Sequence, residues 1–299
     1  MKLMIIKILL GGCFSLFLAS TIRVWNTEPS TYLPARIEDV SFTSEGIEIA
    51  GTLWLPEGAG PFPAIVMGHG SGKSTRSSGR SAAEHFSDKG IAFLTYDKRG
   101  VGESEGAYVG RQNGSEKNLK LLASDVTAGV SYLKSRNDIV PDKIGLWGVS
   151  QAGWILPITA SHDDEIIFTI LLSGPTVTVG EENYYSDLTG DDGSQRGTLT
   201  SEEISALLAK KGPYGFDPLP YLEKMDIPGL WLLGADDMSI PIPETVAHLN
   251  RLISEGHDFK YLIFFQANHG LRVGGKIVED YWHVQDAFLE DVVKIKIYK

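Results

Sequence analysis

The sequence predicts an α/β protein with a mainly parallel central sheet and helices on both faces. Short, almost wholly apolar segments alternate along the chain with longer amphipathic ones. This is the pattern of buried parallel strands and the helices that connect them. A chain of 299 residues is long enough for one large domain of this kind. A polar stretch rich in glycine and aspartate breaks the alternation at 178–224 and is predicted to be an insertion.

The expected elements begin with a β-hairpin at 38–56, where apolar and polar residues alternate around a Ser-Glu-Gly turn. Apolar runs then predict the buried strands, and amphipathic or apolar helix-like runs predict the helices. The expected strands lie near 64–67, 91–96, 144–148, 166–172, 229–233 and 261–265, and the expected helices near 82–88, 119–135, 155–158, 243–255 and 279–293.

Ser150 lies between an apolar run that ends at Gly148 and a helix-like run that follows. A serine flanked by small residues between a strand and a helix is typical of a nucleophile elbow, which projects the hydroxyl toward its base and its substrate. The usual pattern is Gly-x-Ser-x-Gly. Here Ala152 replaces the second glycine, so a slightly wider turn is expected. The N–H of Gln151, at the start of the helix, is expected to face the oxyanion.

An acid and a histidine follow the serine, each just beyond the end of an expected strand. They are Asp237 and His269. The carboxyl ends of parallel strands are where α/β proteins gather their chemistry. A serine nucleophile needs a base that takes its proton and a carboxylate that orients the base. The sequence therefore predicts Ser150, Asp237 and His269 as catalytic residues, and the spacing to the following Ile-Pro pair favours Asp237 over Asp236.

The glycine-rich turn at 68–72 allows two interpretations. It can direct the backbone N–H of Ser71 at the oxyanion, which makes Ser71 and Gln151 the predicted oxyanion-hole residues. The stretch 68–75 also nearly matches a P-loop, so a nucleotide-binding protein is the alternative. In that register the first glycine would fall at Met67, and the residues after Lys73 read as a loop rather than as a helix.

A second serine matches the Gly-x-Ser-x-Gly pattern letter for letter. Ser104 lies in Gly-Glu-Ser-Glu-Gly at 102–106. It stands well past the preceding strand, and no helix is expected after it. The two adjacent glutamates would also oppose the formation of an oxyanion. We therefore expect Ser104 to have no role as a nucleophile.

Charge and cysteine content exclude several classes of protein. The formal net charge of −11 argues against a nucleic-acid-binding protein and against adhesion to anionic lipid. The single cysteine, Cys13, excludes an intramolecular disulfide and a cysteine-based metal site.

The N-terminal segment, residues 1–25, differs from the rest of the chain. Two lysines precede an apolar run at 8–22, which is typical of a signal peptide or an N-terminal membrane anchor. Cleavage, retention as an anchor and lipidation at Cys13 are all left open. Residues 26–37 are expected to be a linker and 38–299 the folded domain. The protein is therefore expected to be exported, to the periplasm or beyond the cell, or to be anchored in a membrane.

The insertion at 178–224 is expected to form a lid over the site, with its own helix near 201–211. Insertions of this length are more often functional than structureless. The alternative is a surface excursion packed by its own aromatic side chains. The aromatic residues singled out as candidates for substrate binding are Tyr184, Tyr185, Tyr214 and Phe216.

Several stretches carry a family resemblance when they are taken as a set. They are 50–53 (AGTL), 60–64 (GPFPA), 69–72 (HGSG), 96–104 (YDKRGVGES), 148–151 (GVSQ) and the surroundings of Asp237 and His269. Over about residues 38–295 the chain resembles the bacterial α/β-hydrolases related to dienelactone hydrolases and serine aminopeptidase-like esterases. The resemblance implies the α/β-hydrolase fold and hydrolysis of an ester, thioester or amide, with no metal and no organic cofactor.

By this resemblance Ser150 is the nucleophile, His269 the base and Asp237 its orienting acid. Ser71 and Gln151 are the oxyanion donors, and Asp97 and Arg99 brace the loop beside the site.

The predicted function is that of a serine hydrolase that cleaves a small or medium carboxylic ester through an acyl-enzyme intermediate. The alternatives with the same triad are an amidase or aminopeptidase and a thioesterase. From other classes, a P-loop-like nucleotide-binding protein and a non-catalytic binding protein with this fold are kept. A small-molecule ester or amide is the expected partner. The acyl group, the leaving group and the oligomeric state are not predicted.

Overall fold

The computed structural model describes residues 35–110, 113–190, 194–195 and 197–298. The predictions for residues 1–25, and for all of the 26–37 linker except its last three residues, lie outside this part. None of the helices that it does describe is both long and apolar enough to span a bilayer.

An eight-stranded sheet forms the centre of the domain, in the order β1-β2-β4-β3-β5-β6-β7-β8. The neighbours from β4 to β8 are all parallel, and the pairs β1–β2 and β2–β4 are antiparallel. The predicted mostly parallel sheet is confirmed. The strands are β1 (Arg36–Ser44), β2 (Ile47–Leu55), β3 (Phe62–Gly68), β4 (Ala92–Tyr96), β5 (Ile139–Val149), β6 (Ile166–Leu172), β7 (Gly229–Gly234) and β8 (Phe259–Phe264).

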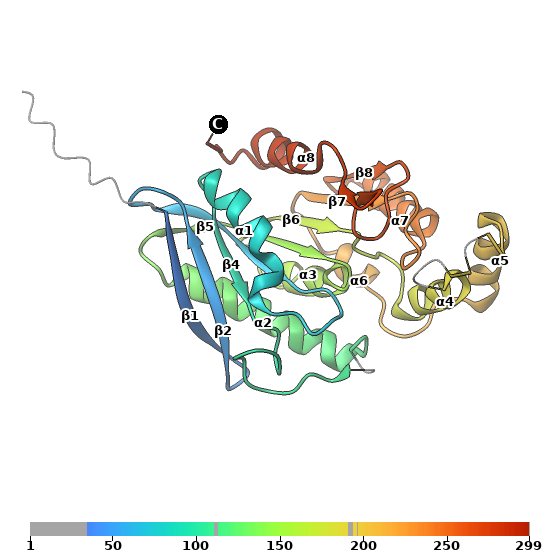
Figure 1. The fold of residues 1–299 in the computed structure, drawn as a ribbon, viewed down its shortest axis with the longest axis horizontal. Coiled ribbons are helices and arrows are strands. Elements are labelled where there is room, and N and C mark those ends of the chain that lie inside the picture. Colours follow the sequence, from blue (N-terminus) through green and yellow to red (C-terminus); the bar gives the residue numbers. More distant parts are fainter. Residues whose placement is uncertain (1–34, 111–112, 191–193, 196, 299) are drawn as a thin grey trace, which may run out of the picture. The chain divides into compact units, whose positions relative to one another are not determined.

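Helices cover both faces of the sheet, and each face has its own hydrophobic core. One core includes Leu122, Leu156 and Leu249, and the other includes Phe86 and Phe288. Figure 1 shows α2 along one side of the sheet and α8 along the other. The first core is closed by α2 (Glu116–Lys134), α3 (Ala152–Ala160) and α7 (Ile242–Ser254), and the second by α1 (Arg80–Asp88) and α8 (Tyr281–Phe288).

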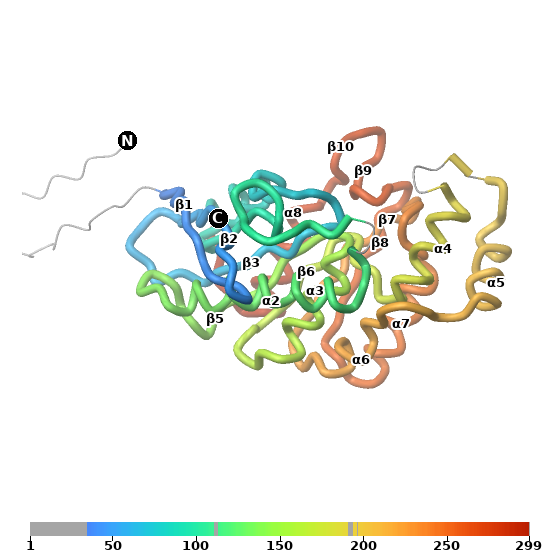
Figure 2. The backbone as a smooth tube through the Cα atoms, turned by 90° about the horizontal axis from the view of Figure 1, so that it is seen from below, coloured from blue at the N-terminus to red at the C-terminus, as the bar shows by residue number. Residues whose placement is uncertain are grey.

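The insertion contains three helices, α4 (Val179–Thr189), α5 (Ser201–Lys211) and α6 (Leu219–Leu222). The expected helix near 201–211 is present as α5. A capping box begins α4, with Thr178 and Glu181, and another begins α5, with Thr200 and Glu203. Both views show α4 and α5 together at one end of the domain, far from β1 (Figures 1 and 2).

Three details differ from the predictions. Strand β1 begins at Arg36, inside the expected linker. A small hairpin, β9 (Arg272–Val273) and β10 (Lys276–Ile277), follows the last long strand and was not predicted. The expected C-terminal helix at 279–293 is divided into α8 and a π-helical turn, Leu289–Val293. Two-residue strands carry too little periodicity to be read from a sequence.

Candidate active site

Ser150 lies at the tip of a sharp turn between β5 and α3. Its φ angle is +53°, a left-handed conformation that residues other than glycine rarely adopt. The turn is held by two backbone hydrogen bonds. Ser150 N donates to Leu172 O at 2.9 Å, and Gly153 N donates to Ser150 O at 2.8 Å. A strained residue fixed in this way at a strand end is a candidate functional residue.

Two glycines leave room for the Ala152 methyl group next to this turn. Ala152 is fully buried. A Cβ placed on Gly148 would lie 2.4 Å from the Ala152 Cβ, and one on Gly68 would lie 3.3 Å from it. The methyl group that distinguishes this turn from the usual pattern therefore occupies space that Gly148 and Gly68 leave open.

Asp237 and His269 form a hydrogen-bonded pair beyond the ends of β7 and β8. His269 Nδ1 lies 2.8 Å from Asp237 Oδ2. The other carboxylate oxygen of Asp237 accepts hydrogen bonds from the backbone N–H groups of Ser239 at 2.8 Å and Ile240 at 3.0 Å. Asp237 is buried, so these contacts hold its carboxylate in one orientation. The side of the His269 ring opposite Nδ1 faces the cavity.

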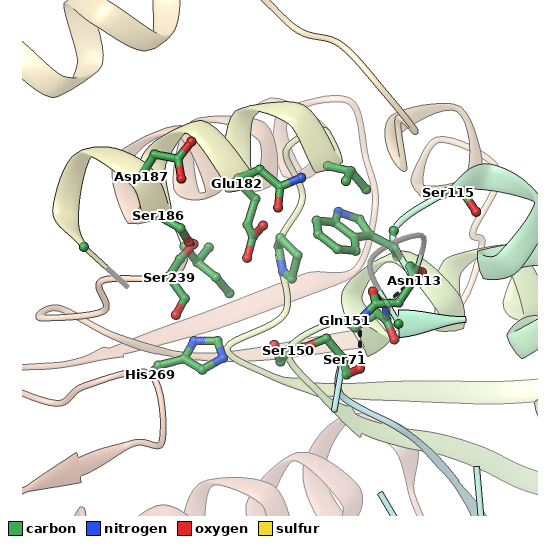
Figure 3. Close-up of a pocket in the computed structure, with 18 of the residues that line it drawn as sticks. Ser71, Asn113, Ser115, Ser150, Gln151, Glu182, Ser186, Asp187, Ser239 and His269 are labelled. Atoms are coloured by element: carbon green, nitrogen blue, oxygen red, sulfur yellow. Dashed lines mark hydrogen bonds between the residues drawn. The ribbon is translucent and has the colours of Figure 1, made fainter. Parts of the chain in front are cut away.

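A cavity of about 1080 Å³ opens over this constellation. Its wall includes Ser150, His269, Ser71 and Gln151, so the structure brings four of the predicted site residues to one surface, with Asp237 directly behind His269. Figure 3 shows Ser150 and His269 near one another on one side of the cavity, with Ser71 beside Ser150.

The N–H groups of Ser71 and Gln151 are available for a ligand. Within the described part of the chain, neither backbone N–H donates a hydrogen bond to the protein. A Cβ placed on Gly70, the residue before Ser71, would lie 3.7 Å from the Ser150 Cβ, so the loop that carries Ser71 passes close to Ser150. Two unpaired backbone donors beside a serine can stabilise a developing oxyanion.

The insertion contributes the opposite wall of the cavity through the polar face of α4. Glu182, Asn183, Ser186 and Asp187 line the cavity. Glu182, Ser186 and Asp187 appear above Ser150 and His269 in Figure 3. None of these four residues was predicted from the sequence. Their spacing of three and four residues is the signal that could have found them, because residues so spaced share one face of a helix.

The four aromatic candidates of the insertion lie elsewhere. None of them is among the residues that line this cavity. Tyr185 donates its hydroxyl to Asp237 O at 2.8 Å, and Phe216 is buried against Tyr221. The Lys211 ammonium lies over the rings of Tyr184 and Tyr214. A role of these side chains in substrate binding stays a prediction, and the geometry gives Tyr185 a part in holding the loop of Asp237.

The loops beside the site are braced by Asp97 and Arg99. Asp97 accepts hydrogen bonds from Arg76 N at 2.7 Å and from Glu103 N at 2.9 Å. Arg99 forms a buried pair with Asp125 at 2.6 Å. Both residues therefore do what the family resemblance implied.

His69 is a buried structural histidine. Its Nε2 donates to Tyr96 O at 2.7 Å. Burial, helped by the positive charge of Lys98, lowers its pKa to about 3, so the ring is neutral at ordinary pH. It lies in the glycine-rich loop after β3, which in a P-loop would open directly into a helix. Here a short 3₁₀ turn, Arg76–Gly79, precedes α1. The carbonyl oxygens of Gly70 and Gly72 in this loop face the ammonium group of Lys98.

Comparisons with known proteins show the family of the chain. The model of the prolyl oligopeptidase family matches residues 77–296, and a model described as esterase FrsA-like matches residues 21–120. The quorum-quenching protein AidA of Acinetobacter baumannii is 32% identical over 44% of this chain and 42% of its own length. The esterase EstD of Thermotoga maritima is 25% identical over 89% of this chain and 68% of its own length.

The chain matches less than half the length of the first curated relatives. Among solved structures, the esterase Pf2001 of Pyrococcus furiosus superimposes with a TM-score of 0.63 at 20% identity, covering 86% of this chain and 92% of that one. At that identity the likeness shows the α/β-hydrolase fold.

Proposed function

The chain belongs to the prolyl oligopeptidase family of serine hydrolases, and from that membership we propose that it is an esterase that cleaves a small or medium carboxylic ester through an acyl-enzyme. One observation carries the proposal. Ser150, the strained residue between β5 and α3, lines the same cavity as His269, and the buried Asp237 holds Nδ1 of His269. This is the arrangement that turns a weak hydroxyl nucleophile into an effective one.

In the proposed reaction, Ser150 Oγ attacks the ester carbonyl carbon while His269 Nε2 takes the hydroxyl proton. Asp237 keeps the proton on Nδ1 and stabilises the imidazolium that forms. The N–H groups of Ser71 and Gln151 bind the oxyanion of the tetrahedral intermediate. The intermediate collapses with transfer of the His269 proton to the departing alcohol. Water then attacks the acyl-enzyme with His269 as base, which releases the acid and restores Ser150.

The substrate class is supported by the relatives and the family model that are named as esterases. The same groups cleave an ester more readily than an amide, because an alkoxide is a better leaving group than an amide anion. The alternatives with the same residues are an amidase or aminopeptidase and a thioesterase. The P-loop interpretation is disfavoured by the loop after β3, which presents carbonyl groups to Lys98.

The test is a panel of chromogenic acyl esters, acyl thioesters and aminoacyl anilides, measured as kcat/KM before and after inactivation by a fluorophosphonate. We expect the esters to be the best substrates and the inhibitor to abolish all turnover. Higher kcat/KM for the anilides would make the protein an amidase or aminopeptidase. No turnover and no inactivation would leave a binding protein with this fold.

We also propose that residues 1–25 direct the protein out of the cytoplasm or hold it at a membrane. The apolar run after two lysines supports this proposal. The proposal concerns location alone, since the described residues that line the cavity all lie in the domain that follows.

A further inference from the structure

Lys98 is a buried lysine behind the predicted oxyanion hole. Only 1% of the residue is exposed, just beyond the end of β4. Its Nζ donates to Gly70 O at 2.6 Å and to Gln151 Oε1 at 2.9 Å, and Gly72 O lies at 3.5 Å. Within the described residues no carboxylate forms an ion pair with it. A buried ammonium that no carboxylate neutralises is costly, which points to a role beyond packing.

The contact with Gly70 O fixes the peptide group that carries the Ser71 N–H. In a trans peptide the C=O and the N–H of the same planar unit point in opposite directions. An ammonium on the Gly70 oxygen therefore holds the Ser71 N–H pointing away from Lys98. The same contact polarises the peptide, which makes that N–H a stronger hydrogen-bond donor.

The contact with Gln151 holds the residue that supplies the second donor. The Gln151 side chain is buried, and its Nε2 donates to Asn113 O at 3.0 Å. Asn113 Nδ2 in turn donates to Ser71 O at 2.8 Å, and the Tyr108 hydroxyl donates to the same oxygen at 2.9 Å. Lys98 thus joins the two loops that carry the two unpaired N–H groups, and Asn113 joins them a second time.

We propose that Lys98 is a positioning residue that assembles the oxyanion hole, by holding the Gly70–Ser71 peptide and the Gln151 side chain at once. This proposal rests on the proposed serine hydrolase function. A hole of this kind must be held within about 0.5 Å of its productive geometry, which two separate loops do not achieve without a common anchor. The positive charge of Lys98 lies at the oxygen end of the Gly70–Ser71 peptide, and it favours an oxyanion at the N–H end.

The charge of Lys98 is lost within an accessible pH range. Burial lowers its pKa from 10.5 to about 8, and Asp125 of α2 opposes this decrease. The neutral ring of His69 and the ring of Tyr108 also face it, and Asp97 and Arg99 are its neighbours in the chain. Since the lowered pKa belongs to a cation, the ammonium is present below pH 8 and is replaced by a neutral amine as the pH rises.

The first experiment compares the kcat and KM of Lys98→Met with those of the wild-type protein on the best ester. Removal of one oxyanion-hole donor costs about 10²–10³ in kcat, and we expect a loss of that size with KM almost unchanged. Lys73→Met is the matched control, because Lys73 is exposed and its ammonium lies 5.6 Å from the same Tyr108 ring. It should retain wild-type kcat. Melting temperatures of both variants show whether the fold is intact.

The second experiment is the pH profile of kcat, which a purely structural lysine would not alter. The wild-type kcat should fall as the pH rises through about 8, and this alkaline limb should be absent from Lys98→Met. In Lys98→Arg the guanidinium stays protonated, so the limb should move to higher pH and part of the kcat should return.

Two results would overturn the proposal. One is a folded Lys98→Met variant with wild-type kcat, and the other is a variant that loses kcat but keeps the wild-type alkaline limb. A wild-type protein that does not react with a fluorophosphonate would instead contradict the serine hydrolase function itself, so the two failures are distinguishable.

Discussion

Two serines of this chain lie within the Gly-x-Ser-x-Gly pattern of a nucleophile or close to it, and their environments in the structure are opposite. Ser104, within the perfect match at 102–106, is buried. Its Oγ donates to Asp97 O at 2.6 Å and accepts from Ala50 N at 2.9 Å. Ser150, within the imperfect match, lies on the wall of the cavity. The hydroxyl of Ser104 is committed to the backbone, whereas that of Ser150 faces the site.

The difference in backbone conformation explains this contrast. At 102–106 the glycines take the left-handed conformations, with φ of +59° at Gly102 and +88° at Gly106. In the elbow the serine itself is left-handed, and Gly148 serves to admit the Ala152 methyl group. The strained backbone between a strand and a helix therefore identifies the nucleophile better than the match to the Gly-x-Ser-x-Gly motif does.

The largest effect should come from Ser150→Ala. Loss of the nucleophile in a comparable triad costs on the order of 10⁶ in kcat, and we expect a loss of this size with an unchanged circular dichroism spectrum. Ser104→Ala is the matched control. It should keep its kcat but unfold more easily by about 1–3 kcal/mol, because the Ala50 N–H loses its buried acceptor. Catalytic loss in Ser104→Ala alone would reverse the comparison.

Asp237→Asn should have the next largest effect. An amide at this position cannot hold the proton on Nδ1 of His269, and an equivalent change can lower kcat about 10⁴-fold. The neighbouring Asp236→Asn serves as its control and should retain most of the activity, since it is Asp237 that lies 2.8 Å from the imidazole. If the two variants ranked in the reverse order in steady-state kinetics, the acid would be assigned to the wrong residue.

A smaller effect is expected where Gly148 and Ala152 share space. Gly148→Ala would place a Cβ 2.4 Å from the Ala152 methyl and 2.9 Å from Gly68 O, and such overpacking costs about 1–3 kcal/mol of unfolding free energy. Combining it with Ala152→Gly should restore part of the loss in urea denaturation, since the contacts with Gly68 O and with Leu156 Cδ1, at 3.2 Å, then remain. Equal stability of the single variant and the wild type would show that the turn is looser than described.

The smallest effect on catalysis should follow deletion of residues 1–25. The described residues that line the cavity all belong to the domain, so the truncated protein should keep the wild-type kcat and KM. Cell fractionation should find the full chain in the exported or membrane fraction and the truncated chain in the cytosol. A truncated protein that aggregates or loses activity would show that the segment belongs to the folded domain.

The sequence predicted what depends on local pattern. Buried strands are apolar runs, so the sheet and the strand ends that carry Ser150, Asp237 and His269 followed from them. The two-residue strands β9 and β10 were missed because they are too short to show a period.

What the sequence could not predict depends on contacts between distant segments. The aromatic residues of the insertion were chosen by type, but the polar face of α4 lines the cavity. From the sequence alone, a lysine beyond the end of a strand is expected to be exposed to solvent. Lys98 is buried because β4, the loop after β3 and the start of α3 converge on it. Only the folded chain shows such a convergence.

The most direct test of the account is the site of covalent modification. The wild-type protein is treated with a fluorophosphonate, digested, and mapped by mass spectrometry. We predict a single adduct, on the peptide that contains Ser150, and none in the Ser150→Ala variant. An adduct on Ser104, or an unmodified protein that still hydrolyses esters, would contradict the assignment of the nucleophile.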